Sequence, residues 1–355
     1  MISAPWQVEK GLKELKRFRR EFDTEHLKVH TLKVFMDGTM KIHTAAMVTP
    51  YEDTHETGVT AFNKEQFAEL LLQLNEEGLD VHLHTVGEAA SRVVLDGVEL
   101  ARKALGDRYR VKVTCAHLEF QNDADLCRFA KLGVTANYTP WWHCGEPGEP
   151  LKQLIPLLGE YRATHMFRCK TVWDTGALVT WSCDNIVFGD FSKWNPFLGM
   201  EVGMTRWISE KTNLDEFQRT LSPLPPASEQ MGVEEMILGY TINGAKQLGI
   251  ESVKGSIEAG KDADFLVFDT ICSRRSIRAS ASMSPGTCIS AGRSSGDGVL
   301  RAALAGAGRP SPRTAAIRKR LCSRSLRDQS CLKSKPDGSS DTERIMLRVL
   351  SNQVL

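Results

Sequence analysis

Residues 79–120 read LDVHLHTVGEAASRVVLDGVELARKALGDRYRVKVTCAHLEF, and this stretch decides the fold. Residues 79–87 predict a strand, residues 89–105 an amphipathic helix, and residues 111–120 a second strand. A strand, a helix and a strand in this order place the two strands parallel, because a helix is long enough to return the chain to the same end of the sheet. The stretch therefore predicts an α/β fold with a parallel sheet.

The same alternation continues on both sides of this unit. Upstream we expect a charged, exposed helix at 6–28, a strand at 30–36 and a helix at 63–77 with Asn63 as its N-cap. Residues 39–60 between them read as a long polar loop. Downstream we expect a helix at 122–132 ending at Gly133, strands at 134–140 and 177–184, and helices at 164–176 and 234–248. Five strands therefore precede Asp184.

Composition places the chain among ordinary globular proteins. Of its 355 residues 41% are hydrophobic and 25% are charged. No run of about 18 apolar residues occurs, and the first residues lack the apolar segment of a signal peptide. The nine cysteines form no CxxC pair, and because their number is odd and the chain is long, no disulfide framework is expected. We expect a soluble, cytoplasmic protein without a membrane partner.

The last 85 residues have a different character. Residues 271–355 hold 16 Arg and Lys against 5 acidic residues, a net charge of +11, and they lack Phe, Trp, Tyr and His. Such a segment buries little apolar surface, so we expect a disordered tail. Binding of nucleic acid or of an acidic surface is the alternative. We do not favour it, because single-strand binding usually needs aromatic residues among the charges.

Four candidate ligands lie at or just after predicted strand ends: Lys33, His84, His117 and Asp184. In a parallel barrel the carboxyl ends of different strands converge on one mouth. Two imidazoles and a carboxylate suit a divalent ion such as Zn²⁺. His82 shares a face of its strand with His84 and could be the ligand instead, but His84 is nearer the strand end.

Further residues could line a substrate pocket at this mouth. Trp142 and His143 follow the strand at 134–140, and at most one of Trp141 and Trp142 should face the pocket because neighbours in an extended chain point apart. Arg168 could contact an anionic group of the substrate, although a surface role fits it equally well.

Several of these segments resemble a known family. KVFMDGTMKIHTAAMVTPY (33–51), VHLHTVGEAASRVVLDGVE (81–99) and ALVTWSCDNIV (177–187) resemble the fourth, fifth and eighth strand segments of amidohydrolase family 3, within the metal-dependent amidohydrolase superfamily. Residues 234–269 resemble the helix that closes the barrel of that superfamily and the return of the chain to a small β-domain. The resemblance covers roughly residues 6–269.

The resemblance implies an architecture and an activity. The architecture is a partial (β/α)8 barrel with strands four to eight in residues 1–250, a remnant of a composite β-domain at 251–270, and the tail at 271–355. The implied activity is hydrolysis of carbon–nitrogen bonds in a small-molecule, amide-type substrate, with a divalent metal, zinc being favoured. A homodimer is a further option.

The resemblance also assigns roles by position. Lys33 would be a strand-four lysine that can be carboxylated and bridge two metals. The alternative is an exposed or ion-paired strand lysine without a role in metal binding. His84 and His117 would be metal ligands, and Asp184 would bind metal and act as general base. An HxH pair on the first strand, which holds one metal in the family, has no counterpart here. The alternative function is therefore a truncated, catalytically inactive remnant of an amidohydrolase.

Overall fold

Five parallel strands form the central sheet of the computed structural model. The structure describes residues 1–145, 147–184, 195–208, 219–262, 264–266 and 288–289. The strands follow one another across the sheet in chain order: β1 (Thr31–Phe35), β2 (Asp80–Thr85), β3 (Val113–His117), β4 (Thr135–Tyr138) and β5 (Val179–Trp181). Parallel neighbours in chain order, each joined through helical segments, are the pattern of a (β/α) barrel, so the predicted fold class is confirmed.

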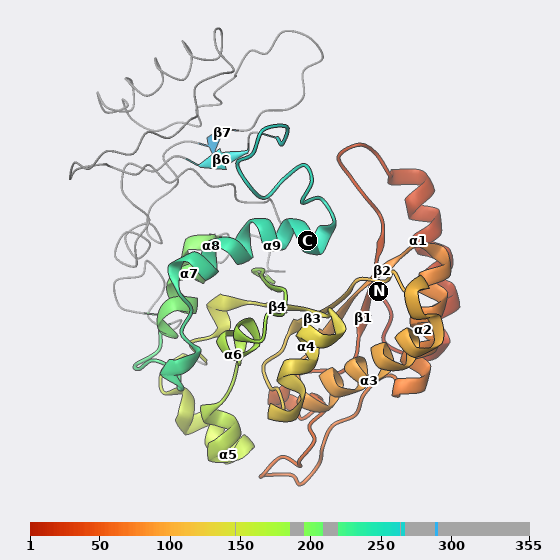
Figure 1. Ribbon diagram of the computed structural model, residues 1–355. Coiled ribbons are helices and arrows are strands. Elements are labelled where there is room, and N and C mark those ends of the chain that lie inside the picture. Colours follow the sequence, from red (N-terminus) through yellow and green to blue (C-terminus); the bar gives the residue numbers. More distant parts are fainter. Residues whose placement is uncertain (146, 185–194, 209–218, 263, 267–287, 290–355) are drawn as a thin grey trace, which may run out of the picture.

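The helices run around the outside of this sheet in an arc (Figure 1). They are α1 (Val8–Phe22), α2 (Lys64–Glu77), α3 (Glu88–Leu105), α4 (Leu126–Leu132), α5 (Pro150–Thr164), α6 (Cys169–Asp174), α7 (Pro196–Thr205), α8 (Val233–Tyr240) and α9 (Ile242–Leu248). None of the helices in the described ranges is both long and apolar enough to cross a membrane.

Local chemistry explains where several helices begin and end. The side chain of Asn63 accepts a hydrogen bond from the backbone N–H of Gln66, and the Gln66 side chain accepts one from the backbone N–H of Asn63. This capping box confirms Asn63 as the N-cap of α2. The single helix predicted at 234–248 is wrong, because the chain breaks at Thr241. There the Thr241 hydroxyl donates to the carbonyl of Ile237 at 2.7 Å, the carbonyl that the Thr241 backbone N–H would bind in a continuous helix. The backbone N–H donates to Leu238 instead.

Two helices were not expected from the sequence. Helix α5 contains Pro156 and a non-helical Gly159 with φ 76°, so it does not show a continuous helical pattern. Helix α7 is apolar on nearly every side and is buried from Phe197 to Thr205, so it lacks the polar stripe of a surface helix.

The loop at 39–60 differs from the polar loop that was expected. Ala45, Met47 and Tyr51 are buried, and they form a second apolar cluster with Leu154 and Leu158 of α5. The sequence suggested solvation because polar residues separate these apolar ones. The contacts with α5 make this segment part of the packed structure.

The two faces of the sheet have opposite character. Outward-pointing side chains such as Leu32, Leu83 and Trp181 join the main apolar cluster beneath the helices. Burial of each such side chain contributes about 1.5–3 kcal/mol. On the inner face, Lys33 lies beside His82, and His82 lies beside Thr114. The sheet therefore presents polar groups toward the barrel interior, which is where the site forms.

A second sheet of two strands is separate from the five-stranded sheet. β6 (Phe265–Leu266) pairs antiparallel with β7 (Cys288–Ile289), so the strand predicted from Asp264 onward begins here. The rest of the predicted tail, residues 290–355, lies outside the described residues, as do residues 267–287. The expected β-domain remnant and tail disorder stay predictions.

Candidate active site

His84 lies near the carboxyl end of β2, opposite Phe35 of β1. Its residue exposure is 9%, and its Nδ1 lies 3.2 Å from Oδ1 of Asp37. The His84 ring centre is 4.6 Å from that of His117 and 4.8 Å from that of Phe35. Neighbouring strands therefore bring the two predicted histidine ligands together.

Asp37 is a residue of this site that sequence reasoning missed. Its carboxylate is fully buried and accepts hydrogen bonds from the backbone N–H groups of Ala46, Val86 and Gly87, at 3.0, 3.0 and 2.7 Å. These partners are distant in sequence, so no local motif connects them. A signal was present nonetheless, since Asp37 directly follows the first predicted strand, as the candidate ligands follow theirs.

His117 ends β3 with an unusual backbone conformation. Its φ is 78°, in the left-handed region, and Leu118 follows with φ 52°. Simple alternation would place His117 on the outer face with the buried Cys115, two residues earlier. Instead its ring lies against His84 and stacks on Trp142 at 5.4 Å. The left-handed backbone accompanies this change of direction.

Asp184 lies at the end of the described segment that follows β5, with φ 41°. Its Oδ2 is 3.8 Å from Nδ1 of His117, and 40% of its side chain is exposed. Partial burial raises the pKa of the Asp184 carboxyl, while the nearby charges of Lys33 and His84 act in the opposite direction. Asp184 is therefore a carboxylate held close to an imidazole and within electrostatic reach of an amine.

Lys33 contributes an amine with an altered proton affinity. Burial lowers the pKa of Lys33 to about 8, and the negative charge of Asp184 partly offsets this effect. The Lys33 Nζ lies 5.6 Å from the ring centre of Phe35. Beside it, burial and the Lys33 charge lower the pKa of His82 to about 3, so His82 is neutral at physiological pH. A substantial fraction of Lys33 is uncharged at mildly alkaline pH.

The candidate pocket residues are placed differently from one another. Trp142 stacks on His117, whereas Trp141 turns away and donates from Nε1 to the carbonyl of Cys183 at 2.7 Å. One of the two tryptophans thus lies at the site, although the chain here is a 3-10 turn, Pro140–Trp142, and not the extended chain on which the expectation rested. Together with Phe35, Trp142 gives the histidine pair an aromatic surrounding.

His143 and Arg168 are not brought to this group. The His143 side chain is fully buried, stacked on Phe167, with Nδ1 3.7 Å from Sγ of Cys169. The Arg168 guanidinium bonds Glu229 at 3.0 Å and Asp123 at 2.7 Å. Both side chains are engaged in packing and ion pairs. Their predicted contact with substrate finds no support in these positions.

The donor types at this site suit a divalent ion. The Nδ1 of His117 is buried and has no hydrogen-bond partner among the described residues. Two ligands of a tetrahedral zinc are about 3.4 Å apart, close to the 3.8 Å between His117 Nδ1 and Asp184 Oδ2. The described part of the chain holds no group of three or more His, Cys, Asp and Glu arranged as a metal site. The residues fit a metal in kind, with the His117–Asp184 pair at a suitable separation.

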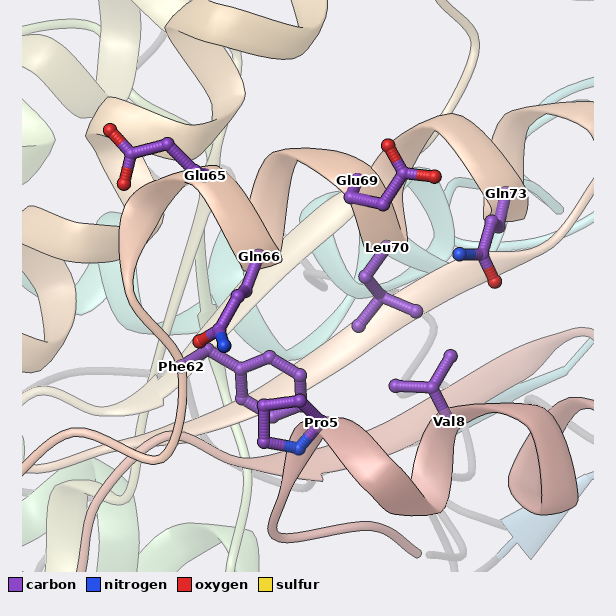
Figure 2. Close-up of a pocket in the computed structure, with 8 residues that line it drawn as sticks. All are labelled: Pro5, Val8, Phe62, Glu65, Gln66, Glu69, Leu70 and Gln73. Carbon is purple, nitrogen blue, oxygen red and sulfur yellow. The ribbon is translucent and has the colours of Figure 1, made fainter.

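An apolar groove of about 350 Å³ lies elsewhere, between α1 and α2 (Figure 2). Pro5, Val8, Phe62 and Leu70 form its apolar surface, and Phe62 and Leu70 belong to the cluster beneath the helices. The groove is on the helical side of the sheet and contains none of the candidate ligands. It is therefore separate from the candidate active site.

Comparison with known proteins supports the interpretation of the fold. The chain is 27% identical over 237 residues to a putative amidohydrolase, YtcJ, of Bacillus subtilis, covering 66% of this chain and 41% of that protein. It is 25% identical over 249 residues to an N-substituted formamide deformylase of Arthrobacter pascens, covering 67% and 40%. The chain thus spans about two fifths of the length of these curated relatives.

Solved structures show the same arrangement of elements. An uncharacterized metal-dependent hydrolase from Pyrococcus furiosus matches with a TM-score of 0.54 and 23% identity, over 73% of this chain and 47% of that one. One from Pyrococcus horikoshii matches with a TM-score of 0.55 and 19% identity, over 73% and 51%. The model of the amidohydrolase family matches residues 2–284. The chain therefore belongs to the amidohydrolase family.

Proposed function

We propose that this chain carries part or all of a metal-dependent hydrolase that cleaves carbon–nitrogen bonds in small, amide-type substrates. The observation that supports this most is the convergence of His84, His117, Asp184 and Lys33 from four different strands or strand ends. In such barrels the carboxyl ends of all the parallel strands lie on one face, so the residues at these ends come together and form the active site. Membership of the amidohydrolase family supports the same reaction class.

His117 and Asp184 would hold the ion, together with His84. A bound divalent ion would make a water acidic and polarise the scissile carbonyl. Asp184 is suited to take a proton from the attacking water, because its partly exposed carboxylate lies 3.8 Å from His117, beside the place that the ion would occupy. It would then return that proton to the departing amine. Trp142 and Phe35 would flank the substrate and exclude bulk water.

Lys33 would act in one of two forms. With a pKa of about 8, its free amine is well populated at mildly alkaline pH, and the free amine is the form that reacts with carbon dioxide. Carboxylation would give Lys33 a negatively charged ligand group. An unmodified Lys33 would instead balance the charge of Asp184. Zinc as the ion, the carboxylated lysine, the homodimer and the cytoplasmic location all stay predictions.

A non-catalytic remnant is the second candidate function. The observation that favours it is that, in the described ranges, no three potential ligands are arranged as a metal site. The two candidates differ in what the purified full chain should bind. A hydrolase retains a divalent ion, whereas a remnant does not.

Metal analysis combined with an activity screen separates the candidates. The full chain would be purified, loaded with Zn²⁺, Co²⁺ or Mn²⁺ and analysed for bound metal, then assayed on a panel of N-formyl and N-acyl amines. We expect about one or two ions per chain and hydrolysis that Asp184→Asn abolishes. Asp174→Asn on the surface of α6 is the matched control and should retain activity. A chain without bound metal under all these conditions contradicts the proposal.

A further inference from the structure

The Asp37 carboxylate contacts three backbone N–H donors and one imidazole nitrogen in the interior of the protein. Oδ1 faces Nδ1 of His84 and the N–H of Val86, and Oδ2 faces the N–H groups of Ala46 and Gly87. The side chain has no exposed surface. Backbone N–H groups only donate, so three of the four partners require Asp37 to be an acceptor.

This environment determines how the ring of His84 is protonated. The Asp37 carboxylate already accepts from three backbone N–H groups, and its contact with Nδ1 of His84 is favourable only if that nitrogen also donates. In a neutral His84 the ring hydrogen is then on Nδ1. The lone pair of the ring then lies on Nε2, the atom that remains to bind a ligand. We propose that Asp37 is a positioning residue, which fixes the tautomer and the orientation of His84 so that Nε2 serves the active site.

Asp37 also joins His84 to the segment at 39–60. The Ala46 carbonyl accepts a hydrogen bond from the N–H of Ala89 at 2.9 Å, so the loop lies against the start of α3. A Cβ on Gly87 would come within 2.0 Å of the Ala46 carbonyl oxygen, which shows how closely the two segments approach. One carboxylate therefore links the end of β1, the loop and the turn that follows His84.

The replacement Asp37→Asn tests this role because an amide cannot accept at both ends. If its NH2 group faces Ala46 and Gly87, two backbone donors lose their acceptor. If the NH2 group faces His84, only Val86 loses its acceptor, provided that His84 moves its hydrogen from Nδ1 to Nε2. The second arrangement leaves fewer unpaired donors, so we expect the Asn variant to change the tautomer of His84.

Nitrogen NMR on the metal-free full chain with ¹⁵N-labelled histidine reads this tautomer directly. The His84 signal is assigned by its loss in His84→Gln. We expect a pyridine-like Nε2 in the wild type and a pyridine-like Nδ1 in Asp37→Asn. Asp125→Asn is the matched control, because Asp125 is a buried carboxylate that binds Arg92 and Arg128 and has no imidazole partner within the described ranges.

Metal affinity provides the second measurement. Titration with Co²⁺ should show binding about 10–100-fold weaker in Asp37→Asn and nearly unchanged in Asp125→Asn. A wild type with its hydrogen on Nε2 overturns the inference, and so does an unchanged tautomer in a folded Asn variant. The wild-type spectrum alone shows which ring nitrogen of His84 carries the hydrogen, so the inference can be refuted even if the variant does not fold. The inference on metal binding rests on the proposed function; a wild type that binds no Co²⁺ refutes that function while the spectrum still tests Asp37.

Discussion

The Nδ1 atom of His117 lies 3.8 Å from Oδ2 of Asp184, and this buried nitrogen has no hydrogen-bond partner among the described residues. A buried nitrogen without a partner costs free energy, and an ion between the two side chains would remove that cost. Ligand that binds only the folded chain adds about 2.7 kcal/mol of stability at 100 times its Kd. We expect Zn²⁺ to raise the melting temperature, EDTA to reverse the rise, and Asp184→Asn to reduce it strongly. An equal rise in that variant would show that the ion binds elsewhere.

Trp142 should influence substrate binding more than stability. Its ring stacks on His117 and is partly exposed, so substitution removes contact area at the site without opening the main core. We expect Trp142→Ala to raise KM roughly tenfold, which corresponds to about 1.4 kcal/mol, and Trp142→Phe to raise it much less. Trp141→Phe is the control, since Trp141 faces Cys183 instead. Equal effects of the Trp141 and Trp142 substitutions would contradict this role.

Lys33 should make stability increase at alkaline pH. Its pKa is about 8 in the folded chain and near 10.5 when exposed, so between these values the unfolded chain binds more protons. The free energy of unfolding therefore rises with pH over this window. Lys33→Met should remove the rise and stabilise the protein at pH 7 by roughly 1–2 kcal/mol. Urea unfolding at pH 7 and 9.5 measures both effects, and Lys131→Met on the exposed face of α4 should change neither.

His143 should make the protein sensitive to acid. Burial and the neighbouring charge of Arg206 hold the pKa of His143 well below its usual range, so it stays neutral in the folded chain. Below pH 6.5 His143 binds a proton in the unfolded chain but not in the folded chain. The free energy of unfolding therefore falls as the pH falls. His143→Phe preserves the stacking on Phe167 and should reduce the loss between pH 6.5 and 5 by up to about 2 kcal/mol. An unchanged pH dependence of urea unfolding would exclude His143 as its source.

Gly239 allows α8 to lie directly on β5. A Cβ at this position would be 2.0 Å from Nε1 of Trp181, a fully buried side chain that cannot retreat. We expect Gly239→Ala to lower the free energy of unfolding by about 2–3 kcal/mol through overpacking. Gly78→Ala, at a position with φ 63° and nothing within 4 Å, should cost only about 1 kcal/mol. Chemical denaturation of both variants gives the comparison.

The sheet could be predicted from sequence because each strand and each helix shows its own pattern of apolar and polar residues within a short segment. Runs such as residues 79–87 alternate or are apolar throughout, and the helices between them have a clear period. Helices α5 and α7 were missed for physical reasons, since Gly159 interrupts one and burial on all sides removes the polar stripe from the other. The loop at 39–60 was misjudged because its apolar residues pack against α5, which no local pattern indicates.

The site was predictable only in part. Three of the four candidate ligands lie at or near strand ends, as their sequence positions indicate, whereas Lys33 is in the middle of β1. The structure brings the four side chains close together. The direction of the His117 ring could not be predicted, because it departs from the alternation of the strand at a left-handed residue. Asp37 was missed because its partners are backbone groups about 9 to 50 residues away.

The φ of 78° at His117 couples the direction of one imidazole to the stability of the fold. A side chain in the left-handed region costs roughly 1 kcal/mol that glycine would not incur. The direction of this one imidazole therefore lowers the free energy of unfolding by a small amount. His117→Gly should therefore relieve backbone strain, but it also removes the ring that lies against His84 and Trp142. The same substitution would empty a buried position, and a cavity there costs more free energy than the relieved strain returns, so stability alone also favours keeping a side chain at this position.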